Sequence, residues 1–174
     1  MPDRPMHDAP GVTPDLRPET LGDHVDRLYR AAWAMCGSRE DAEDLVQETF
    51  AKVLSRRREI GSDDPLPYLL QVLRNTFVSG LRTRDRRPRT AAIDEAEAVF
   101  AAPVSDGPQA RVEAREVFAA IAALPPEYRD VIAAVDVAGL SYAEAAEALG
   151  IPQGTVMSRL YRGRGRVAER VGAA

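Results

Sequence analysis

The sequence predicts an all-α protein of two small helical domains joined by a flexible linker, the C-terminal domain being a helix-turn-helix. Apolar residues recur at helical spacing along residues 21–87 and 112–174, and no stretch of useful length alternates as a strand would. Residues 88–111 lack a sustained apolar period and contain Pro103 and Pro108, as linkers commonly do. The 174 residues, 45% of them hydrophobic, suffice for compact but modest cores.

Residues 1–20 form a tail that we expect to be disordered. They contain five prolines and alternating charges but no apolar core, which excludes a secretory signal and a membrane span. Cys36 is the single cysteine, so the sequence offers no disulfide framework and no paired-thiol metal site. These features predict a cytoplasmic protein without membrane insertion.

Three helices are expected in the N-terminal domain. The first runs from Leu21 to Cys36 and ends at Gly37, after which Ser38 caps the second. The third follows the break at Pro67. Apolar side chains at helical spacing form the inward faces: Val25, Leu28, Ala32 and Met35 in the first helix, Leu45, Val46, Phe50 and Val53 in the second, and Leu69, Val72, Leu73, Phe77 and Leu81 in the third.

The second helix carries a cluster of acids. Residues 39–48 contain five carboxylates against Arg39 alone. Acids in a first helical turn interact favourably with the helix dipole, but Asp44 and Glu48 lie beyond that turn. Spacing alone leaves two explanations open, a solvated helix face and a docking site for a basic protein.

A basic run begins on the third helix. Between Arg74 and Arg89 there are six arginines and a single acid, Asp85. Solvated helix faces usually mix signs, so this run favours contact with phosphates. Arginine outnumbers lysine by 22 to 1 in the whole chain, so a genome-wide codon bias is an alternative explanation for the residue type.

Residues 112–174 are expected to form four helices, the last two being a helix-turn-helix. Ser141 and Glu144 have the spacing of a capping box, Gly150 suits a left-handed C-cap, and Pro152 is tolerated in a first turn. The predicted inward residues of this motif are Ala145, Ala146, Leu149, Val156 and Leu160.

The second helix of the motif has the chemistry of a helix that reads a DNA groove. From Gln153 to Arg170 it holds five arginines and one acid, within an acidic protein. A helical hairpin with a solvated charged face is the alternative. The residues at the start and on the outer side of this second helix, which could contact DNA, are Gln153, Gly154, Thr155, Ser158, Arg159 and Arg162.

Three segments together resemble bacterial sigma factors, most closely those of the extracytoplasmic-function (ECF) group. The residues ALPPEYRDVI (123–132) and GLSYAEAAEALGIPQGTVMSRLYRGR (139–164) resemble their promoter-binding C-terminal domain. SREDAEDLVQETFAKV (38–53) is similar to the helix that docks on the clamp of core RNA polymerase, and PYLLQVLRNTFVSGLRTRDRR (67–87) to the segment that opens and reads the −10 element. Departures from the usual residues are Met157 for Lys, Tyr68 for Trp and Ser79 for Asp.

The resemblance implies three sets of site residues. Those for core polymerase docking are Asp41, Glu43, Asp44, Gln47 and Glu48; those for the −10 element are Tyr68, Arg74, Asn75, Arg82 and Arg84; those for the −35 element are Gln153, Thr155, Ser158, Arg159, Arg162 and Arg164. The implied partners are core RNA polymerase and promoter DNA, with the chain a monomer and an anti-sigma protein left open.

No constellation of catalytic residues stands out. His7 and His24 lie near the tail, there is one cysteine, and no metal-ligand spacing occurs, so we expect neither enzymatic activity nor a cofactor or metal site. The stretch from Gly163 to Ala168 mimics a dinucleotide loop, but it follows a helix, and we expect helix-terminal glycines there. The alternative function is a stand-alone helix-turn-helix regulator, which would bind DNA as a symmetric dimer and would need no acidic docking face.

Overall fold

The computed structural model describes residues 22, 24–55, 64–84 and 108–172. The described residues form helices and contain no strand, which confirms the all-α prediction. The expected tail, 1–20, and most of the expected linker, 88–107, lie outside the described residues.

Among the described residues, the N-terminal half contains α2 (Val25–Cys36), α3 (Arg39–Ser55) and α4 (Leu66–Arg84). The predicted boundary at Gly37 is confirmed, since this residue takes a left-handed conformation with φ of 77°. The hydroxyl of Ser38 accepts a hydrogen bond from the backbone N–H of Asp41 at 3.3 Å and so caps α3. At the start of α4, the Asp64 carboxylate accepts from the N–H of Leu66 at 2.8 Å.

The C-terminal half contains α5 (Pro108–Ala122), α6 (Pro126–Ile132), a π-helical turn η1 (Ala133–Val137), α7 (Tyr142–Leu149) and α8 (Gln153–Gly172). The linker prediction was wrong for residues 108–111, which form the first turn of α5. Pro108 begins that helix because a first-turn residue needs no N–H partner. The π-helical turn was not anticipated, since its alanines give no periodic signal distinct from an α-helix.

The helix-turn-helix forms by the predicted local devices. Ser141 and Glu144 make a reciprocal capping box, with bonds of 3.2 Å and 2.7 Å, and Gly150 takes a left-handed φ of 65°. The expected inward faces hold only in part: Ala145, Val156 and Leu160 are buried, but Ala146 and Leu149 are half-buried and Ala148 is buried instead.

Gly163 lies in the middle of α8, so the expectation of a helix-terminal glycine was wrong there. This glycine is buried where α8 crosses α6. A Cβ at this position would lie 2.8 Å from Cδ1 of Ile132 and 3.3 Å from Cβ of Tyr128. Only a residue without a side chain lets the two helices approach so closely.

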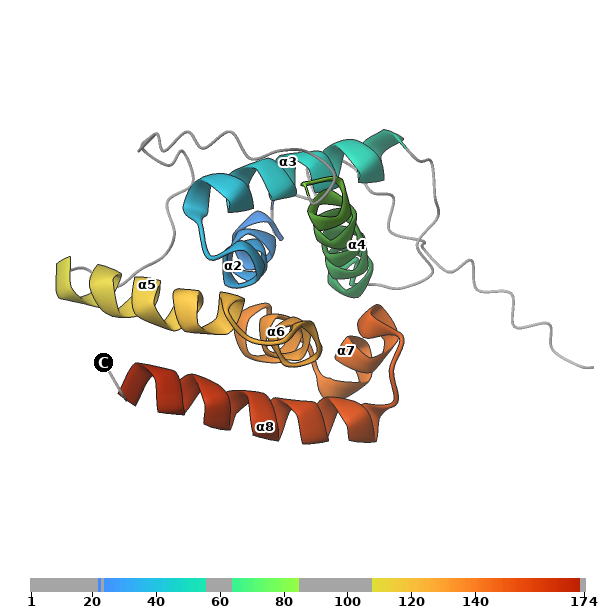
Figure 1. The fold of residues 1–174 in the computed structure, drawn as a ribbon. Coiled ribbons are helices and arrows are strands. Elements are labelled where there is room, and N and C mark those ends of the chain that lie inside the picture. The colour runs from blue at the N-terminus through green and yellow to red at the C-terminus, as the bar shows by residue number, and fades with distance from the viewer. Residues whose placement is uncertain (1–21, 23, 56–63, 85–107, 173–174) are drawn as a thin grey trace, which may run out of the picture.

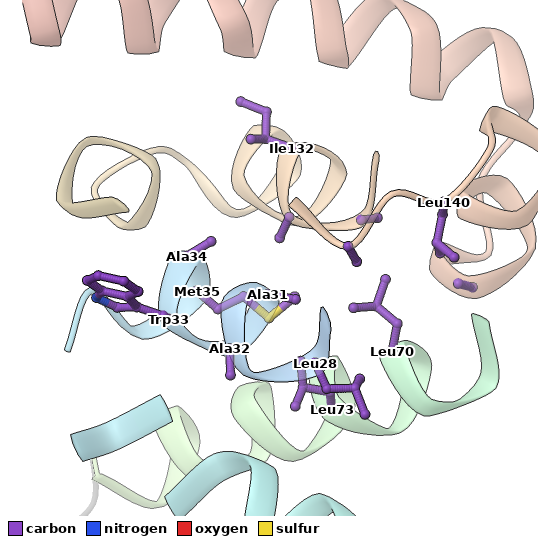
Figure 2. Packing of buried hydrophobic residues seen from close by; sticks show 14 of the residues in the cluster. Leu28, Ala31, Ala32, Trp33, Ala34, Met35, Leu70, Leu73, Ile132 and Leu140 are labelled. Atoms are coloured by element: carbon purple, nitrogen blue, oxygen red, sulfur yellow. The ribbon is translucent and has the colours of Figure 1, made fainter. Parts of the chain in front are cut away.

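The two halves pack against each other around α2. Figure 1 shows them as stacked layers, with α3 on one outer side and α8 on the opposite side. Figure 2 shows α2 in the middle, with Leu28 beside Leu73 of α4 and Ala34 facing α6 and η1, while Leu70 of α4 faces Leu140. A single continuous apolar cluster therefore replaces the two separate modest cores expected from the sequence.

Candidate functional surfaces

Three of the acids on α3 lie along one side of a groove. Asp41, Asp44 and Glu48 recur every three or four residues and line a cavity of about 420 Å³. Its other walls come from apolar residues of α4, such as Phe77 and Leu81, and from the C-terminal half. We refer to Asp41, Asp44 and Glu48 as the acidic face; it combines negative charge with apolar surface.

The remaining two predicted docking residues are arranged differently. Gln47 is exposed on α3. Glu43 is half-buried and close to Tyr29, whose pKa is raised mainly by burial, while Arg39 lowers it and Glu43 raises it. Glu43 therefore lies where α3 packs on α2.

Helix α4 separates the predicted −10 residues onto two sides. Tyr68 and Asn75 line a small hollow of about 190 Å³ together with Lys52 of α3. Arg74 points instead toward the C-terminal half, where its Nε donates to Asp130 Oδ2 at 2.6 Å. Arg82 is exposed at the end of α4; Arg84 is the last residue of the helix, and its side chain lies outside the described part.

The side chains that line the hollow on α4 can both stack on a planar polar group and form hydrogen bonds with it. Its lining combines the ring of Tyr68, the amide of Asn75, the hydroxyl of Ser79 and the ammonium group of Lys52. Lys52 is held by an ion pair with Glu48 at 2.7 Å and donates to Thr76 Oγ1 at 3.3 Å. Sequence reasoning missed Lys52, because its proximity to α4 depends on the packing of two helices.

The outward side of α8 carries the residues predicted to contact the −35 element. Gln153, Ser158 and Arg162 are exposed, while Thr155 and Arg159 are half-exposed next to them. The backbone N–H groups of the first turn point out at this end of the helix, where the dipole also favours a phosphate. The start of α8 can therefore contact both backbone and bases of a duplex.

Arg164, another of the predicted −35 residues, is paired with an acidic side chain of the protein itself. Its guanidinium donates to both carboxylate oxygens of Asp136 in η1, at 2.9 Å and 2.5 Å. This hydrogen bonding raises the pKa of Arg164. In the described conformation Arg164 thus fixes α8 against η1, although its side chain remains half exposed to solvent at 55%.

Two exposed apolar side chains on α8 were not selected from the sequence. Tyr161 is 83% exposed and Met157 is 52% exposed, and they lie one turn apart on the same side. The sequence contained a sign of this exposure. Met157 and Tyr161 are four residues apart, like Val156 and Leu160, but each is shifted by one position from the predicted inward pair and so faces another side of the helix. Apolar side chains at such positions can contact thymine methyl groups.

The described residues contain no cluster of three or more histidine, cysteine or acidic side chains able to hold a metal ion. None of the helices in these ranges is both long and apolar enough to cross a membrane.

Two family descriptions match the chain. Residues 21–87 match "Sigma-70 region 2" and residues 114–167 match "Sigma-70, region 4". Among curated relatives, the ECF RNA polymerase sigma factor SigE of Mycolicibacterium smegmatis is 36% identical over 84% of this chain, which spans 58% of that relative's length. The ECF RNA polymerase sigma factor EcfG of Rhodopseudomonas palustris is 33% identical over 90% of this chain and 85% of its own length.

Solved structures agree with these matches. The sigma factor RpoE of Bartonella quintana, solved in complex with the anti-sigma factor NepR, has a TM-score of 0.67 at 27% identity, covering 88% of this chain and 95% of that one. CnrH, solved with the cytosolic domain of CnrY, has a TM-score of 0.64 at 23% identity and shows the same fold.

Proposed function

The chain belongs to the ECF group of RNA polymerase sigma factors, and from this premise we propose that it binds core RNA polymerase and directs transcription initiation at promoters with −35 and −10 elements. The observation that carries the proposal is the exposed reading side of α8, a basic helix start presented by a capped helix-turn-helix. Polymerase supplies the catalysis, and the chain acts in the cytoplasm with it. The stand-alone regulator is not favoured, because the similarity extends to region 2 as well.

The direct test is promoter-specific run-off transcription. The purified chain and core polymerase together should yield a transcript of defined start, whereas either component alone should not. If the chain bound the same promoter duplex tightly as a dimer and added nothing to core polymerase, the regulator hypothesis would replace this one.

We assign −35 recognition to Gln153, Thr155, Ser158, Arg159, Arg162 and Arg164 on α8. A bidentate arginine–guanine pair is worth about 1–3 kcal/mol, so Arg159→Ala or Arg162→Ala should lower promoter use about 5- to 150-fold. Promoters already mutated at the contacted base pair should show little further loss. Independent effects of the two changes would show that the assignment is wrong.

We assign −10 recognition to α4, where Tyr68, Arg74, Asn75, Arg82 and Arg84 lie on one helix. The hollow between Tyr68, Asn75 and Lys52 is a candidate site for an unstacked base, held by stacking and by hydrogen bonds. Asn75→Ala should impair opening of double-stranded promoters, while a promoter with a premelted −10 region should lose less.

We propose that the acidic face docks on core polymerase together with its neighbours on α3. By resemblance to the docking helix of sigma factors, the contacting residues are Asp41, Glu43, Asp44, Gln47 and Glu48. Reversal of Asp44 and Glu48 to Arg should weaken core binding without loss of helicity. A matched control is the reversal of Glu113 and Glu116, two exposed acids on α5 that change the net charge equally. If both reversals weakened core binding equally, the effect would come from the net charge of the protein and not from contact at the acidic face.

Binding to both promoter elements requires the two halves to separate. Elements about 25 base pairs apart lie roughly 85 Å apart at 3.4 Å per pair, whereas each small domain has a radius of gyration of about 11 Å. Two domains of this size that pack against each other, as in Figure 1, are too small to span that distance. An anti-sigma protein is a further proposed partner, on the likeness to RpoE, which was solved bound to NepR.

A further inference from the structure

Two exposed apolar side chains lie on the part of α8 that the proposed function places against DNA. Among the residues that the structure describes, large apolar side chains are exposed on five helices, but only α8 exposes two of them. They are Met157, which is 52% exposed, and Tyr161, which at 83% is the most exposed of the group. We refer to Met157 and Tyr161 as the apolar pair. Single exposed apolar residues are common, whereas neighbouring ones mark binding surfaces.

The apolar pair shares the outward side of α8 with polar residues. At about 100° per residue, Met157 and Tyr161 are about 40° apart around the helix axis. Ser158 lies about 60° beyond Tyr161, and Arg162 lies about 40° beyond Ser158. All four side chains are exposed. A partner that binds Ser158 and Arg162 therefore meets the apolar pair as well.

The neighbouring positions along α8 leave the apolar pair uncovered. Side chains of a helix lean toward its N-terminus, so Met157 lies over the turn that contains Gly154. A Cβ at Gly154 would meet nothing within 4 Å, and the same holds for Gly165, four residues after Tyr161. Because glycine adds no side chain at either position, a partner can approach the apolar pair closely.

The major groove of DNA offers one apolar group to such a pair. Its floor presents hydrogen-bond donors and acceptors, and the apolar group among the four bases is the methyl group on C5 of thymine. A methylated cytosine carries the same group at the same ring position. Four residues span about 6 Å along α8, and base pairs are about 3.4 Å apart. The apolar pair can therefore contact methyl groups that are one or two base pairs apart.

The charges of α8 favour a duplex over an apolar protein surface as the partner. The segment from Gln153 to Arg170 holds five arginines and one acid. Two of these arginines are engaged within the protein, Arg164 with Asp136 and Arg166 over the ring of Tyr128 at 4.5 Å from its centre. Fewer guanidinium groups are then left to read bases, so apolar contacts make up a larger share of the readout.

We propose that Met157 and Tyr161 form a contact site for the C5-methyl groups of pyrimidines and thereby add to the specificity for the −35 element. This inference rests on the proposed function and extends the set of residues assigned to that element. A methionine cannot neutralise a phosphate, so the contribution of Met157 depends on the base sequence and not on the backbone. Burial of one methyl group changes an affinity about fourfold.

The test uses holoenzyme made from the full chain and core polymerase. Selection from promoter duplexes randomised over the −35 region first gives the element, and each of its thymines is then replaced by uracil, which removes only the C5-methyl group. At least one replacement should weaken promoter binding about fourfold. Cytosine and 5-methylcytosine are then compared at the sensitive position, where the methylated base should bind about fourfold more tightly.

Substitutions in the protein assign the effect to the apolar pair. Met157→Gln keeps the length of the side chain but not its apolar character, Met157→Leu keeps it apolar, and Tyr161→Ala removes the ring. Met157→Gln or Tyr161→Ala should abolish the response to uracil at the position that the replaced side chain contacts, whereas Met157→Leu should retain it. Val112→Ala, at a 50% exposed position of α5, is the matched control and should leave every response unchanged.

The proposal is overturned if wild-type holoenzyme selects a defined −35 element and uracil has no effect at any of its thymines. It is also overturned if the response to uracil persists in both Met157→Gln and Tyr161→Ala, or if these variants lose affinity for core polymerase instead, which would make the apolar pair a protein contact.

The two base replacements distinguish the sources of the methyl group. A response to uracil alone identifies thymine as the source, and a gain with 5-methylcytosine shows that a methylated cytosine is accepted too; both results support the proposal. Failure of the proposed function looks different, since the wild-type chain would then select no element together with core polymerase.

Discussion

The crossing of α6 and α8 can be tested by adding one methyl group. Gly163→Ala places a Cβ 2.8 Å from Cδ1 and 3.3 Å from Cγ1 of Ile132, and 3.3 Å from Cβ of Tyr128. Overpacking of this kind costs about 1–3 kcal/mol, while replacement of glycine by alanine inside a helix gains about 1 kcal/mol. We therefore expect a net loss of stability of up to about 2 kcal/mol.

Gly165→Ala is the matched control on the same helix. Gly165 is exposed and a Cβ there would meet nothing within 4 Å, so this change should stabilise by about 1 kcal/mol. The helix-propensity gain cancels when the two variants are compared. Their difference, about 1–3 kcal/mol, measures the close approach of the helices alone.

Urea unfolding followed by circular dichroism gives both free energies, provided the slope with denaturant is unchanged. Ile132→Val removes the nearest atom and should cost less in the Gly163→Ala background than in wild type, with a coupling of about 0.5–2 kcal/mol. The reasoning would be refuted by a Gly163→Ala protein as stable as Gly165→Ala, or by strict additivity with Ile132→Val.

Three further predictions concern the helix-turn-helix. Ser141→Ala should destabilise the full chain by about 1 kcal/mol in urea unfolding. Hydrogen bonds from Ser141 lower the pKa of Glu144, so the stability that this carboxylate contributes should be complete above its unfolded pKa and disappear as pH falls through the lowered folded pKa. A loss of stability that does not change with pH would argue against the capping box. Met157→Lys should add one phosphate contact and steepen the salt dependence of duplex binding by about one unit, with an unchanged slope excluding that contact. Asp136→Asn should free Arg164 and tighten promoter binding measured with holoenzyme, and weaker binding would mean that the pair positions α8 instead.

Local rules in the sequence were sufficient for much of the fold. The capping box at Ser141 and the left-handed glycines Gly37 and Gly150 could be predicted because each depends on neighbours within four residues. The function of Gly163 could not be predicted, since it depends on Ile132 from another helix. The sequence likewise gave no sign that Arg74 faces Asp130, 56 positions away.

The central position of α2 has a consequence for synthesis of the protein. Helices α2, α3 and α4 leave the ribosome first, but η1, which covers one face of α2, ends about fifty residues after α4. At about 5–20 residues per second, roughly 3–11 s pass before that covering is made. During this interval the nascent N-terminal half presents Arg74 and the acidic face without Asp130 or Arg129 to restrain them. Both surfaces are therefore open to a partner during synthesis, before the C-terminal half packs against them.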